Sequence, residues 1–203
     1  MNRMKLWIIA AAMMCCGVGC LTSCQGSGNA DAEKPAEDST AVTANVDEVA
    51  RLEAINRFLV DSIGKQYAPG EVCIPCVQVI GTEQQDPSAV LVWGDFWVYN
   101  YNVAGDTLKM VSGGSHPGLM CLQSLDNGYV VTGFERVADG SDFLPSAKRL
   151  FGNKFDEFQK VNSDQEKREE ARARSIADYV KANELPYKYY QDYGWPAIEI
   201  PVK

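Results

Sequence analysis

The chain is poor in the residues and motifs that enzymes commonly use for catalysis. His116 is the only histidine among its 203 residues. The sequence contains no Gly-x-Ser-x-Gly turn, no His-Glu-x-x-His pair and no phosphate-binding Gly-rich loop. Those motifs position the nucleophile, the zinc ion or the phosphate in large classes of hydrolases and nucleotide-binding enzymes. Their absence argues against these classes and favours a non-enzymatic function.

Long apolar runs are absent as well, with one exception at the N-terminus. Arg3 and Lys5 precede an apolar run from Leu6 to Cys20, which leads into Leu21-Thr22-Ser23-Cys24. The run has about the length of a signal-peptide core and is shorter than the ~20 residues that a membrane-spanning helix needs. The sequence therefore predicts a signal peptide.

The end of this signal resembles the lipobox of bacterial lipoproteins. Leu21 lies three residues before Cys24, and a small residue lies directly before that cysteine. The resemblance implies that residues 1–23 are removed and that Cys24 carries lipid. The protein would then be exported and anchored to a bacterial membrane, at the periplasmic side or the cell surface. Cys20 is the alternative acceptor, but Gly17 stands where a large aliphatic residue is expected.

Basic residues are scarce in the predicted mature chain. Without Arg3 and Lys5, the 19 basic residues fall to 17 against 27 acidic ones, a net charge of −10. An acidic chain gains no counterion-release affinity for nucleic acid and is repelled by anionic lipid. We therefore expect no nucleic-acid partner, and membrane attachment through the lipid alone.

Residues that could form a core are missing directly after the lipidation site. The segment 24–44 consists mainly of small, polar and acidic residues. Such a composition cannot offset the entropy lost on ordering, so it predicts a disordered tether. One domain, residues 45–203, follows the tether, with a C-terminal helical extension over about 146–203.

Cysteines available for disulfides are few once the signal is removed. Cys73, Cys76 and Cys121 remain beside the lipidated Cys24, so at most one bridge can form within the chain. Cys73 and Cys76 precede a strand pattern, where residues three apart point to opposite faces, about 10 Å from each other. That geometry argues against a redox disulfide and against a zinc site completed by His116. We therefore expect buried thiols, with a bridge from one of them to Cys121 as an alternative. His116 is expected at a surface bulge, and we expect no metal and no cofactor.

The predicted domain begins with a helix and continues with strands. Asn45 and Glu48 form a capping box, and apolar residues then recur every three or four positions up to Gly64: Val46, Val49, Leu52, Ile55, Leu59 and Ile63. Stretches rich in β-branched and aromatic residues follow, separated by short turn signals: Val72–Ile80, Val90–Val103, Thr107–Val111 continuing into Leu119–Leu125, and Tyr129–Val137. Because such short connections join antiparallel neighbours, we predict an α+β fold, with the N-terminal helix packed on a four-stranded antiparallel meander.

The helical period returns after residue 142. Ser146 is expected to cap a short helix through Phe151, and a capping box at Ser163–Glu166 begins a helix that runs to about Asn183. An aromatic tail follows Pro186, with Tyr187, Tyr189, Tyr190, Tyr193 and Trp195. The sequence thus predicts C-terminal helices and an aromatic tail behind the sheet.

A helix followed by a curved antiparallel sheet resembles the cystatin-like and ketosteroid-isomerase-like group of folds. It is also similar to lipoproteins of Bacteroidota that carry such a domain behind a tether. The resemblance covers about residues 45–138 and rests on element order and the lipobox. It implies a sheet that wraps the helix, and it transfers no catalytic residue, because no motif matches.

The stretch 90–103 is the most unusual of the predicted strands. Its alternation places Val90, Val92, Phe96 and Val98 on one face, and Trp93, Asp95, Trp97, Tyr99 and Tyr101 on the other. Both faces are apolar, so both are expected to be covered. The second face, called the aromatic face below, either lines a pocket in which Asp95 is desolvated, or is covered by the C-terminal helix and tail as ordinary core.

Two functions remain open at this point. The favoured one is a tethered binding domain that contacts an unknown protein or small-molecule ligand through the aromatic face or the aromatic tail. The alternative is a small-pocket enzyme that uses Asp95 for proton transfer or hydrolysis, with a tyrosine or His116 as its partner. The missing catalytic motifs favour the first function.

Overall fold

The computed structural model describes residues 38–86 and 88–201, so the predicted signal peptide, Cys24 and the tether up to residue 37 lie outside the described residues. The elements run in sequence order: α1 (Asp38–Phe58), the π-helical turn η1 (Leu59–Ile63), η2 (Gly64–Gln66), β1 (Val72–Asp86), β2 (Ala89–Ala104), β3 (Thr107–Leu125), β4 (Gly128–Arg136), η3 (Gly140–Asp142), α2 (Phe143–Phe151), η4 (Gly152–Lys154), α3 (Phe155–Ser163), α4 (Gln165–Ala182), β5 (Tyr189–Gln191) and β6 (Ile198–Glu199). The chain therefore has the predicted α+β fold.

The sheet is built around the predicted meander. β1 to β4 pair antiparallel with their neighbours in sequence, in the order β1-β2-β3-β4. β3 is long enough to pair with β4 near its C-terminal end and with a parallel β5 near its N-terminal end. β6 pairs antiparallel with β5, so the aromatic tail adds two short strands that the sequence did not predict.

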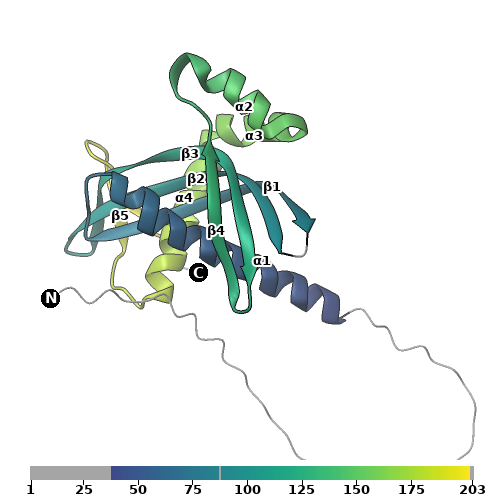
Figure 1. Ribbon diagram of the computed structural model, residues 1–203. Coiled ribbons are helices and arrows are strands. Elements are labelled where there is room, and N and C mark those ends of the chain that lie inside the picture. The colour runs from purple at the N-terminus through teal and green to yellow at the C-terminus, as the bar shows by residue number, and fades with distance from the viewer. Residues whose placement is uncertain (1–37, 87, 202–203) are drawn as a thin grey trace, which may run out of the picture.

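Helices cover both faces of this curved sheet (Figure 1). α1 crosses one face, α4 lies against the other, and α2 and α3 pack at one end of the sheet on the α4 side. The core accordingly has one cluster under α1, one under α4 and one under α2 and α3. Among the described residues, no helix has both the length and the hydropathy that a membrane crossing requires.

The first helix begins earlier than its capping box predicts. α1 starts at Asp38 rather than at Asn45, so the last residues of the predicted tether, 38–44, are helical. Val46 and Val49 are exposed, and the buried stripe of α1 consists of Ala54 and Ile55. The prediction was wrong here because α1 extends past the sheet, where apolar spacing continues without a surface to pack on.

The end of this helix is shaped by its contact with the sheet. The turn η1 is π-helical, with the Gly64 N–H donating to the carbonyl of Leu59, and it places Leu59 and Ile63 in the core. Gly64 meets β1 so closely that a Cβ there would lie 2.7 Å from the Cys73 sulfur. A side chain at position 64 would have to displace the Cys73 sulfur, which favours glycine at this contact between the helix end and the strand.

Two of the predicted caps near the C-terminus are displaced. α2 begins at Phe143, and Ser146 lies inside its first turn, where its hydroxyl donates to the Asp142 carbonyl and accepts from the Ala138 N–H. α4 begins one residue after Asp164, whose carboxylate accepts from the Lys167 N–H at 3.0 Å. Asp164, rather than Ser163, is the N-cap, and both residue types suit that position.

Candidate functional site

The five residues of the predicted aromatic face do lie on one side of β2, and the protein's own elements cover them. Trp93 belongs to the cluster under α2 and α3, where its indole N–H donates to the Leu150 carbonyl at 2.9 Å. Trp97, Tyr99 and Tyr101 belong to the cluster under α4, together with Tyr190 of β5. Of the two alternatives, the structure has the one in which the C-terminal helix and tail form core on this face.

Asp95 is fully buried in the middle of this face and has specific partners. Its two carboxylate oxygens accept from the Trp97 indole N–H at 2.8 Å and from the Ser115 hydroxyl at 2.6 Å. Burial raises the pKa of Asp95, and the two hydrogen bonds and the nearby Arg168 charge oppose that rise. The opposing residue on β1, Gln78, has a buried side-chain oxygen without a hydrogen-bond partner among the described residues. Asp95 is therefore the centre of a closed polar cluster rather than the wall of a pocket.

Replacing Asp95 by asparagine should change the pH dependence of stability. Because the folded pKa lies above the ordinary value of 3.8, the stabilisation from neutral Asp95 is complete below that value and is lost as pH rises through the folded pKa. Asparagine keeps both hydrogen bonds by accepting from Trp97 and donating to the Ser115 oxygen. We expect Asp95→Asn to gain stability relative to the wild type as pH rises from 4 to 8, measured by urea unfolding.

The exposed Asp86 is a control, because its contribution to stability should change with pH in the opposite direction to that of Asp95. The Ser88 hydroxyl and N–H donate to its carboxylate and lower the pKa of Asp86, so its contribution to stability is lost as pH falls. An Asp95→Asn curve that tracks the wild-type curve at every pH would show that burial does not control the ionisation of Asp95.

His116 does not lie near Asp95, so the predicted pairing of these residues is wrong. His116 opposes Phe96 on the α1 side of the sheet, whereas Asp95 opposes Pro117 and points to the α4 side. The predicted bulge is also elsewhere: the β2–β3 register shifts where Val111 has no partner, and His116 is half-buried in regular pairing. The tyrosine that His116 contacts is Tyr67, at 2.9 Å.

The three cysteines are free thiols. Cys73 packs against the cluster under α1 and Cys76 lies in the cluster under α4, so the pair occupies opposite faces of β1 as the strand geometry predicts. Burial raises the pKa of Cys73 to about 11 and also raises the pKa of Cys76, which suppresses the reactive thiolate. Cys121 forms no bridge, and no group of three metal-ligating residues occurs within 38–86 and 88–201.

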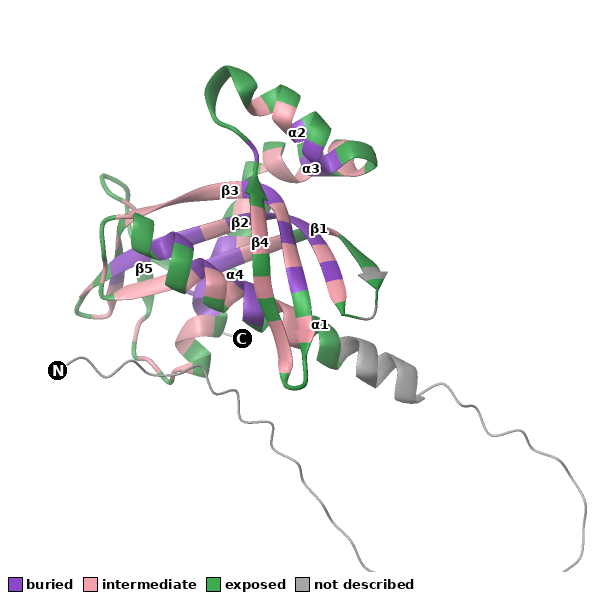
Figure 2. Cartoon of the chain, in the orientation of Figure 1, coloured by how far each residue is buried: buried purple, intermediate pink, exposed green. Residues whose placement is uncertain are grey.

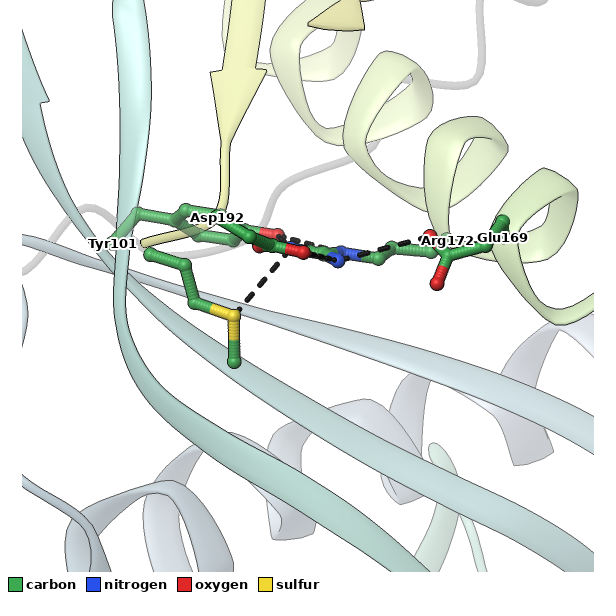
Figure 3. Close-up of polar contacts among 5 residues, drawn as sticks. Tyr101, Glu169, Arg172 and Asp192 are labelled. Atoms are coloured by element: carbon green, nitrogen blue, oxygen red, sulfur yellow. Dashed lines mark hydrogen bonds and ion pairs between the residues drawn. The ribbon is translucent and has the colours of Figure 1, made fainter. Parts of the chain in front are cut away.

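Arg172 is a buried charged residue with many polar contacts, which sequence reasoning missed. Its guanidinium is buried under the tail and binds both carboxylate oxygens of Asp192, at 2.7 and 2.5 Å, and the Tyr101 hydroxyl at 3.1 Å (Figure 3). It stacks on the Tyr99 ring with 4.3 Å between the guanidinium carbon and the ring centroid. Glu169 approaches one side at 3.8 Å. This set of contacts, called the Arg172 clamp below, joins α4, the sheet and the chain after β5.

The partners of Arg172 control its pKa. Burial alone would lower the pKa of Arg172, but the hydrogen bonds that it donates to Asp192 and Tyr101 and the charge of Asp192 raise it. The sequence did contain a signal, because Arg172 lies four residues before Ile176 and therefore on the buried stripe of α4. A charged residue on such a stripe indicates a buried partner.

The Arg172 clamp holds the base of a hairpin whose tip is exposed. Tyr193 is 97% exposed and Trp195 is 71% exposed, and both lie between β5 and β6. The loop of this hairpin, yellow at the upper left of Figure 1, has the green of exposed residues in Figure 2. The turn is fixed by the Trp195 N–H donating to the Asp192 carbonyl at 3.1 Å, and by the Gln191 amide donating to the Trp195 carbonyl at 2.8 Å. Gly194 supplies the left-handed conformation, with φ of +78°, that this turn requires. Tyr193 and Trp195 thus form an exposed aromatic surface on a hydrogen-bonded turn, which we call the aromatic hairpin tip.

Two surface hollows of the described residues lie away from the aromatic face and the tip. One of about 620 Å³ is lined by residues of α2 and α3, and another of about 680 Å³ by residues around the α3–α4 junction. The aromatic hairpin tip exposes a tyrosine and a tryptophan, residue types that are enriched at protein interfaces. Comparisons with protein-family models, with curated proteins and with solved structures find no match to this chain, so the resemblance to cystatin-like folds stays a prediction.

Proposed function

We propose that this chain is an exported lipoprotein, anchored through Cys24, whose α+β domain binds a partner protein through the aromatic hairpin tip. The observation that carries the proposal is the exposure of Tyr193 and Trp195 on a hairpin with a fixed base. Tryptophan and tyrosine are the residues that contribute most at protein interfaces, and each gains roughly 2–3 kcal/mol when fully buried on binding.

Rigidity of the hairpin supports a role in binding. The Arg172 clamp and the turn hydrogen bonds fix the tip before any partner arrives, so little conformational entropy is lost on association. Side chains as exposed as Tyr193 and Trp195 can enter a pocket on a partner, whereas they do not enclose a small molecule. The enzymatic alternative has less support, because Asp95 is fully buried and both of its oxygens are engaged.

The tip and the start of the described chain lie far apart. α1 begins at the lower right of Figure 1, whereas the yellow β5–β6 hairpin is at the left of the molecule. Because the tether joins α1, an anchor on Cys24 leaves the tip free to reach a partner away from the anchoring point.

Site-specific photocrosslinking tests this proposal in the native host. A benzophenone amino acid at position 193 should give a discrete crosslinked adduct, because position 193 is exposed and an aromatic side chain is kept there. The same amino acid at the exposed Leu144 of α2 is the control and should give no such adduct. The additional change Trp195→Ala should reduce the adduct at 193 at least tenfold, which corresponds to about 1.4 kcal/mol. Equal adducts at 144 and 193, or an adduct indifferent to Trp195→Ala, would exclude the hairpin tip as the binding surface.

A further inference from the structure

A second cluster of polar side chains lies on the other face of the sheet, away from the aromatic hairpin tip. Tyr67 follows η2, His116 lies in the middle of β3, and Arg136 ends β4. The Tyr67 hydroxyl is 2.9 Å from Nε2 of His116, and one Arg136 nitrogen is 3.5 Å from Nδ1 of the same ring. Three residues distant in sequence thus meet around both nitrogens of the only histidine.

The fold builds this cluster rather than leaving it to flexible side chains. The loop that carries Tyr67 is fixed by Asn100 and Ser112, whose side chains donate to the Ala68 carbonyl at 3.2 and 2.6 Å. Gly114 provides the space, since a Cβ there would lie 2.4 Å from the Tyr67 hydroxyl oxygen. Any larger residue at position 114 would displace the tyrosine from His116.

The hydrogen-bond roles in the cluster follow from Arg136. A guanidinium only donates, so Nδ1 of His116 accepts, and in the neutral ring Nε2 carries the proton and donates to the Tyr67 oxygen. Burial and the Arg136 charge lower the pKa of His116 against the opposing charge of Asp139, which keeps the ring neutral at pH 7. The proton of the Tyr67 hydroxyl is then left to donate outward.

A positive charge with unused donors lies at the other nitrogen of the ring. Arg136 is exposed and gives one contact to His116, and its guanidinium has five N–H groups. The adjacent Glu135 pairs with Arg149 at 2.7 Å instead, and no ion pair joins Arg136 to a carboxylate among the described residues, although the Asp139 charge acts on both Tyr67 and His116. We propose that Tyr67, His116 and Arg136 form a binding site for a small oxyanion, in which Arg136 and the Tyr67 hydroxyl donate to its oxygens. Carboxylate and phosphate groups share the required chemistry.

The single histidine makes this proposal directly testable. The full chain is purified without a histidine tag in a non-ionic detergent, and the imidazole resonances of His116 are followed by NMR against pH. Millimolar sodium phosphate, sodium acetate or sodium chloride is added at constant ionic strength. A bound anion stabilises the imidazolium, so phosphate or acetate should raise the pKa of His116 by about one pH unit, and chloride should not.

Three variants decide whether the effect belongs to this cluster. Tyr67→Phe and Arg136→Gln should each abolish the response to the anion. Arg174→Gln removes one exposed charge from α4, on the opposite side of the sheet, and should preserve it. A response to phosphate alone would indicate a phosphate ligand, and a response to acetate alone would indicate a carboxylate ligand. A response to both would indicate a site that accepts either kind of oxyanion. No response to either anion, or an unchanged response in Arg136→Gln, would overturn the proposal, and neither result bears on the aromatic hairpin tip.

Discussion

Breaking the Arg172 clamp should destabilise the domain by about 3–5 kcal/mol, the usual cost of removing one partner from a buried ion pair. Arg172 is 3% exposed, and its guanidinium joins α4, Tyr101 of the sheet and Asp192 of the hairpin. A domain of this size has about 5–15 kcal/mol of stability, so the loss is a large share of the total. The urea midpoint of unfolding, followed by far-UV circular dichroism, measures it.

The two single variants should lose different amounts of stability, because Arg172 is more deeply buried than Asp192. Asp192→Ala leaves a guanidinium almost without access to water, whereas Arg172→Met leaves a carboxylate that is about one-third exposed and can be hydrated. We therefore expect Asp192→Ala to cost more than Arg172→Met. The double variant should cost much less than the sum of the singles, because it removes both charges together.

A nearby arginine provides the matched control. Arg174 lies two residues along α4 and pairs with Glu170 at 3.6 Å, with both side chains about half exposed. Exposed pairs of this kind contribute at most about 1 kcal/mol, so Arg174→Ala should change the midpoint little. Additive effects of Arg172→Met and Asp192→Ala would mean that the two residues act independently, contrary to the clamp.

The sheet was predictable from the sequence because its signals are local. Alternation of apolar residues along 90–103 and short turns such as Asn127-Gly128 define strands and their antiparallel order, and the structure confirms both. Even the interruption at Gly94 corresponds to a bulge in the facing strand, between Val79 and Gly81. Helix starts were less predictable, because a capping box at Asn45 does not show that the preceding residues are non-helical.

The features of the proposed binding surface were harder to predict from the sequence, because they depend on contacts between distant segments. Alternation correctly grouped Trp93, Asp95 and Trp97, but only the positions of α2, α3 and α4 decide whether that face is open or covered. Exposure of Trp195 and Tyr193 likewise depends on the pairing of β5 with β3, which involves three residues on each strand. Successive side chains of a strand point to opposite faces of the sheet. The register between β2 and β3, had it been known, would therefore have placed His116 and Asp95 on opposite faces.

Replacement of Cys24 by alanine should abolish membrane anchoring through lipid, the largest effect we expect of any single change. The modifying enzyme needs the thiol, so Cys24→Ala should incorporate no labelled fatty acid and should accumulate as the uncleaved precursor. Cys20→Ala is the matched control and should be labelled and processed normally. Labelling that persists in Cys24→Ala and disappears in Cys20→Ala would place the lipid on Cys20.

The acyl chains should account for the whole of the attachment. At ~0.8 kcal/mol per buried methylene, a sixteen-carbon chain contributes roughly 12 kcal/mol. The predicted mature chain has a net charge of −10, and none of the described helices could span a membrane. Residues 25–203 behind an ordinary secretory signal should therefore be recovered entirely in the soluble fraction of the exported proteins, by immunoblot after cell fractionation. Retention of that unlipidated form on membranes, resistant to high salt, would mean that the domain itself binds the membrane.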